Sequence, residues 1–210
     1  MKKENTNLPK ILRTLKILYP NPACALHYTK PWELLVAVIL SAQCTDKKVN
    51  EVTKVLFKKY KTLDDYVAAK PAEFEQDIHA TGFYRAKTKN ILAAAKVLKY
   101  DFGGKIPKTM SEMITIPGVG RKTANVVLGE LYGTAEGIAV DTHVIRLSQL
   151  FGLTKNTDAT KIEQNLMQIV PKKDWVSFSH MLILYGREHC TARCKHTDCP
   201  LKDFVIRANM

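Results

Sequence analysis

Residues Ile116 to Leu128 read IPGVGRKTANVVL, and the interpretation of the whole chain starts from this stretch. A proline and two glycines, Gly118 and Gly120, interrupt the chain before a helix-like run that begins at Arg121. Glycine permits positive φ and a close approach of the backbone to a ligand. Amides at a helix N-terminus bind phosphate oxygens without reading a base. The stretch therefore predicts a phosphate-binding turn, or else a plain turn between two helices.

Lys122 occupies the start of that helix-like run, where the helix dipole repels a cation. One interpretation is a solvated lysine that contacts phosphate. The other is a reactive amine, because the positive helix end, the neighbouring Arg121 and partial desolvation all favour the neutral form. An ammonium group is not a nucleophile, so only the second interpretation gives Lys122 a chemical role.

The overall charge favours an anionic partner such as nucleic acid or a membrane surface. The 210 residues carry a formal net charge of +12, and 46% of them are hydrophobic, which is ample for a core. The longest apolar run, Leu34 to Leu40, has seven residues, against about 20 needed to cross a bilayer. The N-terminal residues lack the apolar region of a secretory signal. We therefore expect a cytoplasmic protein whose five cysteines stay reduced.

Helical periodicity dominates the chain, and no set of alternating strands is evident. Start signals agree with it, because Thr45 and Asp158 precede apolar-periodic segments. One helix face is expected to carry Val52, Val55 and Leu56. The other periodic segments are 32–39, 91–98, 144–150 and 162–170. The pattern predicts an all-α fold, as one large domain or two small intertwined ones.

Several separate segments together resemble the endonuclease III family of helix-hairpin-helix DNA glycosylases. The opening stretch is followed by AVDTHVIRLSQLFGL at 139–153; the other matching segments are NPACALHYTKPWELLVAVILSAQCTD at 21–46, TGFYRAKTKNI at 81–91 and MLILYGREHC at 181–190. They occur in the family's order and cover nearly the whole chain. The resemblance implies a two-lobed all-α fold. Residues 24–134 would form a six-helix lobe with its hairpin at about 112–131, and residues 1–23 with 135–210 the second lobe.

The resemblance also implies two catalytic residues. The family's nucleophile matches Lys122: its amine attacks C1′ of a damaged nucleotide, expels the base and forms a Schiff base. Proton loss at C2′ then breaks the strand 3′ to the lesion by β-elimination. The family's catalytic carboxylate matches Asp141, which also suits the N-cap of a helix beginning near Thr142. The neighbouring His143 needs no chemical role.

DNA contacts follow from the same match, because a base must leave the duplex before it can be excised. Gln43 matches the residue that fills the vacated space, and Phe83 matches an apolar wedge on the opposite strand. The alternatives are a polar residue at a helix end for Gln43 and a core aromatic for Phe83. Backbone contacts to DNA are expected at Gly118, Gly120 and Arg121. Further phosphate contacts are expected at Lys87, Lys89, Lys105 and Lys108.

The C-terminal cysteines depart from the family pattern C-x6-C-x2-C-x5-C, which holds a 4Fe-4S cluster. Here Cys190, Cys194 and Cys199 give C-x3-C-x4-C, and Val205 stands at the fourth position. Cluster ligation ordinarily takes four cysteines. The leading prediction is therefore a degenerate loop, 190–205, that has lost its metal and binds no cofactor.

Two alternatives stay open for this loop. A zinc ion would bind the three cysteines with either His189 or His196, or a cluster would keep a fourth ligand that is not cysteine. If the metal is lost, the loop is expected to be held by packing of Pro200, Leu201 and Phe204. Cys24 and Cys44 look like small buried hydrophobic residues.

The resemblance implies a bifunctional glycosylase and AP lyase that acts, as a monomer, on double-stranded DNA containing oxidised pyrimidines or abasic sites. One alternative is a monofunctional mismatch glycosylase of the same superfamily. Such enzymes usually lack a lysine at the position of Lys122, and the chain ends without the extra domain of adenine-mismatch enzymes. A non-catalytic helix-hairpin-helix module is the other alternative. It would carry Lys122 and Asp141 together only by coincidence.

Overall fold

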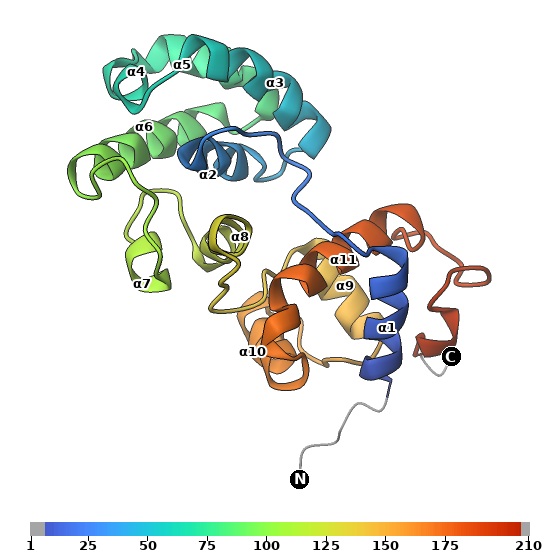
Figure 1. The fold of residues 1–210 in the computed structure, drawn as a ribbon. Coiled ribbons are helices and arrows are strands. Elements are labelled where there is room, and N and C mark those ends of the chain that lie inside the picture. Colours follow the sequence, from blue (N-terminus) through green and yellow to red (C-terminus); the bar gives the residue numbers. More distant parts are fainter. Residues whose placement is uncertain (1–6, 207–210) are drawn as a thin grey trace. The chain divides into compact units, whose positions relative to one another are not determined.

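The computed structural model describes residues 7–206, and all the regular secondary structure in that range is helical (Figure 1). The prediction of an all-α protein is therefore confirmed. The chain divides into two compact units. The first is Ala25–Gly133, and the second consists of the described parts of Met1–Cys24 and Thr134–Met210.

The first unit is built around α2, whose residues are all apolar except Glu33 in its first turn. Residues 32–40 of this helix are all buried, as expected for a helix at the centre of a core. Helix α6 packs against α4 and α5, while α2 packs against α3, α6 and α8. The elements of this unit are α2 (Pro31–Leu40), α3 (Asp46–Lys59), α4 (Leu63–Ala68), α5 (Pro71–Ile78), the 3-10 turn η1 (His79–Thr81), α6 (Tyr84–Tyr100), α7 (Met110–Met113) and α8 (Arg121–Tyr132).

Helix α3 begins where the sequence indicates, but its buried face was predicted wrongly. Thr45 caps the helix by accepting a hydrogen bond from the amide of Lys48. The inner face carries Val49, Thr53 and Leu56, whereas the side chain of Val55 is 68% exposed. Val52, Val55 and Leu56 share a helix face by their spacing, but the neighbouring helices cover the face centred on Val49, Thr53 and Leu56, which leaves Val52 half-buried and Val55 outside.

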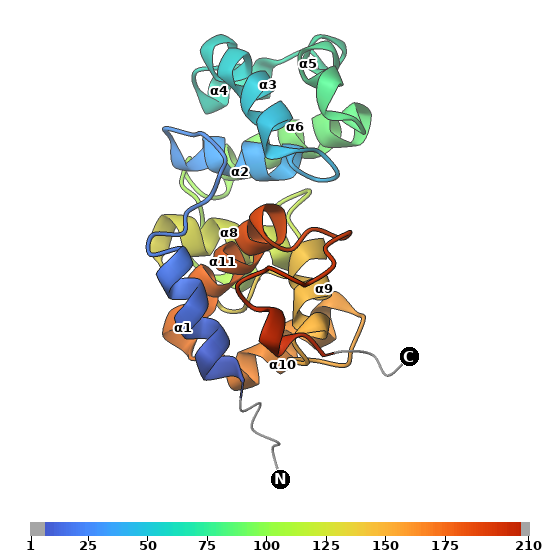
Figure 2. The ribbon, with the colours of Figure 1, turned by 90° about the vertical axis from the view of Figure 1, so that its right-hand side faces the viewer.

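The second unit packs α11 against α1 and α9 (Figure 2). Asp158 caps α10 by accepting from the amide of Lys161 at 3.0 Å, as its place before an apolar-periodic segment predicts. After α11 the chain returns, and the amide of Ile206 donates to the carbonyl of Leu150 at 2.8 Å. The elements are α1 (Leu8–Leu18), α9 (Thr142–Leu150), α10 (Ala159–Ile169), η2 (Lys172–Asp174), α11 (Trp175–Glu188) and η3 (Lys202–Phe204).

None of the helices within residues 7–206 combines the length and the apolar character needed to cross a membrane.

Candidate functional site

The turn before α8 needs glycine at one position for two separate reasons. Gly118 has φ of +80°, in the left-handed region that L side chains rarely adopt. A Cβ atom at Gly118 would also lie 2.7 Å from the Cβ of Asn90 on α6. Val119 is buried, and its amide donates to the carbonyl of Ile116 at 3.0 Å. The turn is thus packed tightly against α6, which fixes where α8 begins.

Helix α8 begins at Arg121 with an open N-terminus. The N-cap residue is Gly120, which has extended backbone and no side chain to cap the first-turn amides. A Cβ atom at Gly120 would meet nothing within 4 Å. Lys122 is the second residue of the helix and is exposed, and its amine has no ion-pair partner among residues 7–206. The start of α8 therefore offers backbone amides to an anion and a lysine amine available to a ligand.

Gln43 and Phe83 both have the left-handed backbone that is rare outside glycine. Their φ angles are 53° and 49°, and each such residue costs on the order of 1 kcal/mol. Gln43 lies in the turn after α2 and is exposed; Phe83 is the N-cap of α6, with a side chain 65% exposed. The alternative of a core aromatic at Phe83 is therefore wrong.

A hollow of about 190 Å³ brings several of the expected DNA-binding residues together. Gln43, Phe83 and Gly118 all line it, as does Thr123, which directly follows Lys122. These residues come from the turn after α2, the start of α6 and the turn before α8. The first unit thus gathers on one concave surface three residues that are up to 75 positions apart in the chain.

Lys87 was expected to contact phosphate, but its side chain is buried, so this prediction is wrong. Its side chain is buried on α6, and its amine donates to the carbonyls of Leu40 at 2.8 Å and Thr81 at 2.7 Å. Burial lowers the pKa of Lys87. Leu40 ends α2 and Thr81 ends η1, so the ammonium satisfies carbonyls at two helix C-termini. Each carbonyl lies a few residues before Gln43 or Phe83.

Asp141 is the N-cap of α9 in the second unit. Its Oδ1 accepts a hydrogen bond from the amide of Val144 at 2.8 Å, and the side chain is half-buried. The predicted capping role is confirmed, and it fixes the direction of the carboxylate. His143 packs against α11, since a Cβ atom at Gly186 would lie 2.6 Å from its Nδ1. Burial is the main cause that lowers the pKa of His143, with Arg187 and Arg146 adding to it and Asp141 opposing it.

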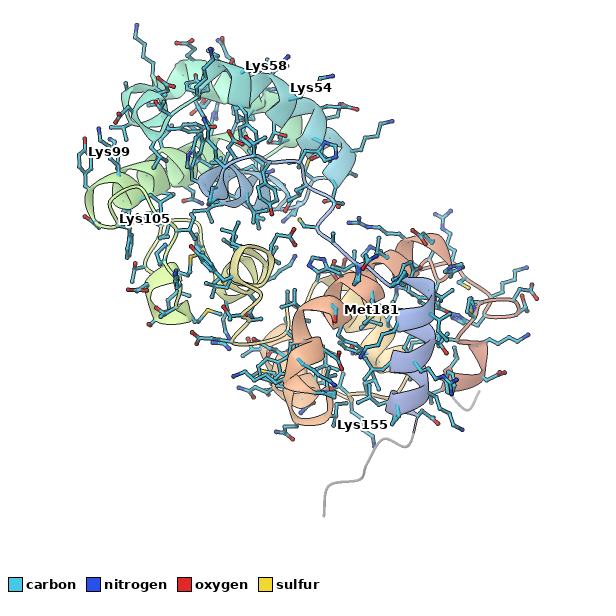
Figure 3. The ribbon with its side chains drawn as sticks, viewed as in Figure 1. Lys54, Lys58, Lys99, Lys105, Lys155 and Met181 are labelled. Carbon is cyan, nitrogen blue, oxygen red and sulfur yellow. The ribbon has the colours of Figure 1, made fainter. Side chains whose placement is uncertain are left out.

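The lysines are spread over the first unit and do not by themselves mark a DNA-binding face. Figure 3 shows Lys54 and Lys58 on α3, Lys99 near the C-terminal end of α6, and Lys105 in the segment that follows this helix. Lys89 and Lys105 are exposed, and Lys108 lies 5.6 Å from the centre of the Tyr132 ring. The hollow and the start of α8 locate the candidate site better than charge does.

The prediction that the C-terminal loop has lost its cofactor is wrong. The sulfur atoms of Cys190 and Cys194 and a ring nitrogen of His196 all lie within 4.8 Å of one another. Thiolate and imidazole are the ligands that bind zinc and iron–sulfur centres. The loop is also packed, with Leu201 fully buried, so packing and a gathered set of ligands occur together.

Comparison with known proteins agrees with this geometry. Residues 36–172 match the profile of the HhH-GPD superfamily of base excision DNA repair proteins. Endonuclease III of Synechocystis sp. is 50% identical over 184 residues, which cover 88% of this chain and 84% of that protein.

Two solved structures of endonuclease III with DNA share the fold. One is a non-covalent complex and the other a trapped covalent intermediate. Each superposes with a TM-score of 0.91 at 41% identity, over 96% of this chain and 95% of the other.

Proposed function

Because the chain belongs to the endonuclease III family of base excision DNA repair proteins, we propose that Lys122 is its nucleophile and that its substrates are oxidised pyrimidines in duplex DNA. An enzyme of this family is a bifunctional DNA glycosylase and AP lyase. The observation that carries the assignment is the start of α8. There, an exposed lysine without an ion-pair partner among the described residues lies in a first helical turn whose amides have no side-chain cap.

The reaction begins when the neutral amine of Lys122 attacks C1′ of the damaged nucleotide. A bond forms between the amine nitrogen and C1′ while the bond from C1′ to the base breaks, and the base leaves with that electron pair and takes up a proton. Ring opening then gives a Schiff base between the lysine and the sugar. Loss of a proton from C2′ expels the 3′ phosphate, which breaks the strand 3′ to the lesion.

Asp141 is assigned to charge stabilisation and proton transfer. A carboxylate near the sugar favours the cationic character that develops at C1′ as the base departs, and it accepts protons from the attacking amine. Its Oδ1 is held by the amide of Val144, so the group has a fixed orientation before substrate binds. The assignment rests on its match to the family's carboxylate, and the cap supports it.

The residues that line the hollow of the first unit are assigned to stabilising the DNA from which the damaged nucleotide has been flipped out. Phe83 presents an exposed ring on a constrained turn, as an apolar wedge between base steps requires. Gln43, which lines the same hollow from the turn after α2, would fill the vacated space. The first-turn amides of α8, which follow Gly120 and have no side-chain cap, hold a phosphate of the backbone, and Arg121 adds charge.

The proposed partner is damaged double-stranded DNA, bound by a monomer in the bacterial cytoplasm. The net charge of +12 supports this, because phosphate neutralisation by Lys and Arg supplies much of the affinity of DNA-binding proteins. We expect the binding to weaken steeply as salt rises.

Duplex oligonucleotides with one oxidised pyrimidine or one abasic site test the proposal. Wild-type protein is expected to cut the lesion strand 3′ to the lesion without alkali treatment. Lys122→Ala is expected to lose cleavage at the abasic site, whereas Lys155→Ala, which changes an exposed lysine of the other unit, keeps it. Equal cleavage by both variants would overturn the assignment of Lys122.

A further inference from the structure

The C-terminal loop carries four thiol or imidazole side chains within ten residues: Cys190, Cys194, His196 and Cys199. When the family's cysteine pattern is counted from Cys199, only His196 and Cys199 itself lie at its ligand positions. Counted from Cys199, the family pattern puts its second and fourth cysteines at His196 and Val205. Val205 is half-buried and packs against the core of the second unit. Cys194 has no counterpart in the pattern. The loop therefore lacks the ligand after Cys199, where Val205 stands, and has an additional one before it, Cys194.

The spacing of the ligands suits a single ion. The Sγ of Cys190 lies 3.6 Å from the Nδ1 of His196, and the Sγ of Cys194 completes a trio within 4.8 Å. Tetrahedral zinc, with Zn–S of about 2.3 Å and Zn–N of about 2.0–2.1 Å, sets the edge between a sulfur and a nitrogen ligand at about 3.6 Å. A 4Fe-4S cluster places a separate iron atom behind each ligand and holds the ligands farther apart.

The backbone of His196 explains how it joins the trio. Its φ of 56° is left-handed, a conformation in which histidine is enriched among non-glycine residues. The amide of His196 donates to the Sγ of Cys194 at 3.3 Å, so the same reversal that turns the imidazole towards Cys190 also directs an N–H group at a thiol. Strained backbone of this kind is frequent at functional sites, and bonds from the gathered ligands to an ion would offset its cost.

His189, the other candidate histidine, is not part of the trio. It is exposed, and its ring lies beside that of Tyr185, with ring centres 5.5 Å apart. Its carbonyl accepts a hydrogen bond from the thiol of Cys194. The structure therefore separates two histidines that the sequence leaves equivalent.

Cys199 is not part of the trio within 4.8 Å, but it belongs to the same loop and is held by a neighbour. It is buried, and its thiol is hydrogen-bonded to the hydroxyl of Tyr185, which in turn accepts from the amide of Leu201 at 2.9 Å. Arg146 on α9 fixes Cys190 in a similar way, since its guanidinium donates to the Sγ at 3.6 Å and also to the Cys190 carbonyl. Groups that orient the ligands from outside are typical of built metal sites.

We propose that this loop binds one zinc ion through Cys190, Cys194, His196 and Cys199, in place of the family's 4Fe-4S cluster. The ion fastens the returning chain to α9 and α11 of the second unit. It takes no part in the chemistry assigned to Lys122, so this proposal stands or falls independently of the proposed function.

Metal content tests the proposal directly. The full-length untagged protein, produced with both iron and zinc supplied, is expected to contain one zinc per chain and no iron, and to be colourless. X-ray absorption at the zinc edge should show three sulfur ligands and one nitrogen ligand. A brown protein with four irons per chain would overturn the proposal, and so would a protein with neither metal in stoichiometric amount.

Histidine variants test the assigned ligand. His196→Ala is expected to weaken zinc binding by about 100-fold or more, since even groups outside the ligand shell contribute about 10–100-fold. His196→Cys should restore zinc binding as a four-cysteine site, and His189→Ala should leave it unchanged. Loss of zinc in His189→Ala with retention in His196→Ala would overturn the assignment. If His196→Ala does not fold, the metal content and X-ray absorption of the wild-type protein still decide.

Discussion

The buried amine of Lys87 joins the end of α2 to the end of η1 by donating to a carbonyl of each. Replacement of Lys87 by methionine removes both hydrogen bonds. The carbonyls of Leu40 and Thr81 then lose a charged donor at 2.8 and 2.7 Å. Each such hydrogen bond contributes about 1.5–3 kcal/mol. Methionine fills most of the same volume and also removes the desolvation cost of an ammonium, which is of the order of several kcal/mol.

The balance of these effects gives an expected loss of about 2 kcal/mol in the free energy of unfolding of Lys87→Met. With an m-value of about 2 kcal/mol/M, the urea midpoint should fall by about 1 M. The matched control is Lys96→Met, at an exposed position of the same helix, where a change within about 0.5 kcal/mol is expected. Equal midpoints for the two variants would refute the role of Lys87 as a clamp.

The same variant should also loosen the turns that carry Gln43 and Phe83, because the two clamped carbonyls lie just before them. We expect Lys87→Met to bind lesion-containing duplex more weakly than Lys96→Met does, in a titration at a temperature where both are folded. An unchanged affinity for the duplex would show that the hydrogen bonds of Lys87 do not contribute to DNA binding.

Three further perturbations test other parts of the structure. Gly118→Ala is expected to lose about 2–4 kcal/mol of unfolding free energy in urea titrations, through positive φ and the contact with Asn90, whereas Gly120→Ala should lose about 1 kcal/mol or less. Phe83→Ala should keep its melting temperature, because the ring is exposed, but lose about tenfold or more in base excision from duplex DNA. The pKa of His143 is lowered in the folded state, so the unfolded state binds the proton first. Stability should therefore fall as pH drops below about 6.5, by up to about 1.4 kcal/mol per pH unit, and less so in His143→Gln.

The contrary outcomes are equally specific. Equal stability of the two glycine variants would mean that the turn before α8 is not packed against α6 as described. Full excision activity in Phe83→Ala would remove the wedge assignment. A pH profile of unfolding free energy that is the same in His143→Gln as in wild type would show that burial of this imidazole does not contribute.

Local signals predicted the helix boundaries that matter for the site. Thr45, Asp141 and Asp158 each cap the helix that follows, because a side-chain oxygen near the first amides is a local arrangement that sequence alone specifies. The glycine turn likewise ends where α8 begins at Arg121. These features depend on residues three or four positions apart.

Features that depend on distant contacts were beyond the sequence. Lys87 looks like any solvated lysine of a helix. Its contact with the carbonyl of Leu40, 47 residues away, exists only because α2 packs against α6. The choice between His189 and His196 depended on a left-handed backbone at His196, which no local pattern at that residue indicates. The error at Val55 arose because periodicity does not say which of two adjacent faces a neighbouring helix will cover.

Covalent trapping tests the central claim most directly. Wild-type protein mixed with duplex DNA containing an abasic site and then treated with borohydride should give a protein–DNA adduct, because the reductant fixes the Schiff base. Peptide mass analysis should locate the link at Lys122, and Lys122→Ala should give no adduct while it still binds the DNA. An adduct at another residue, or no adduct from wild-type protein that binds the DNA tightly, would contradict the account.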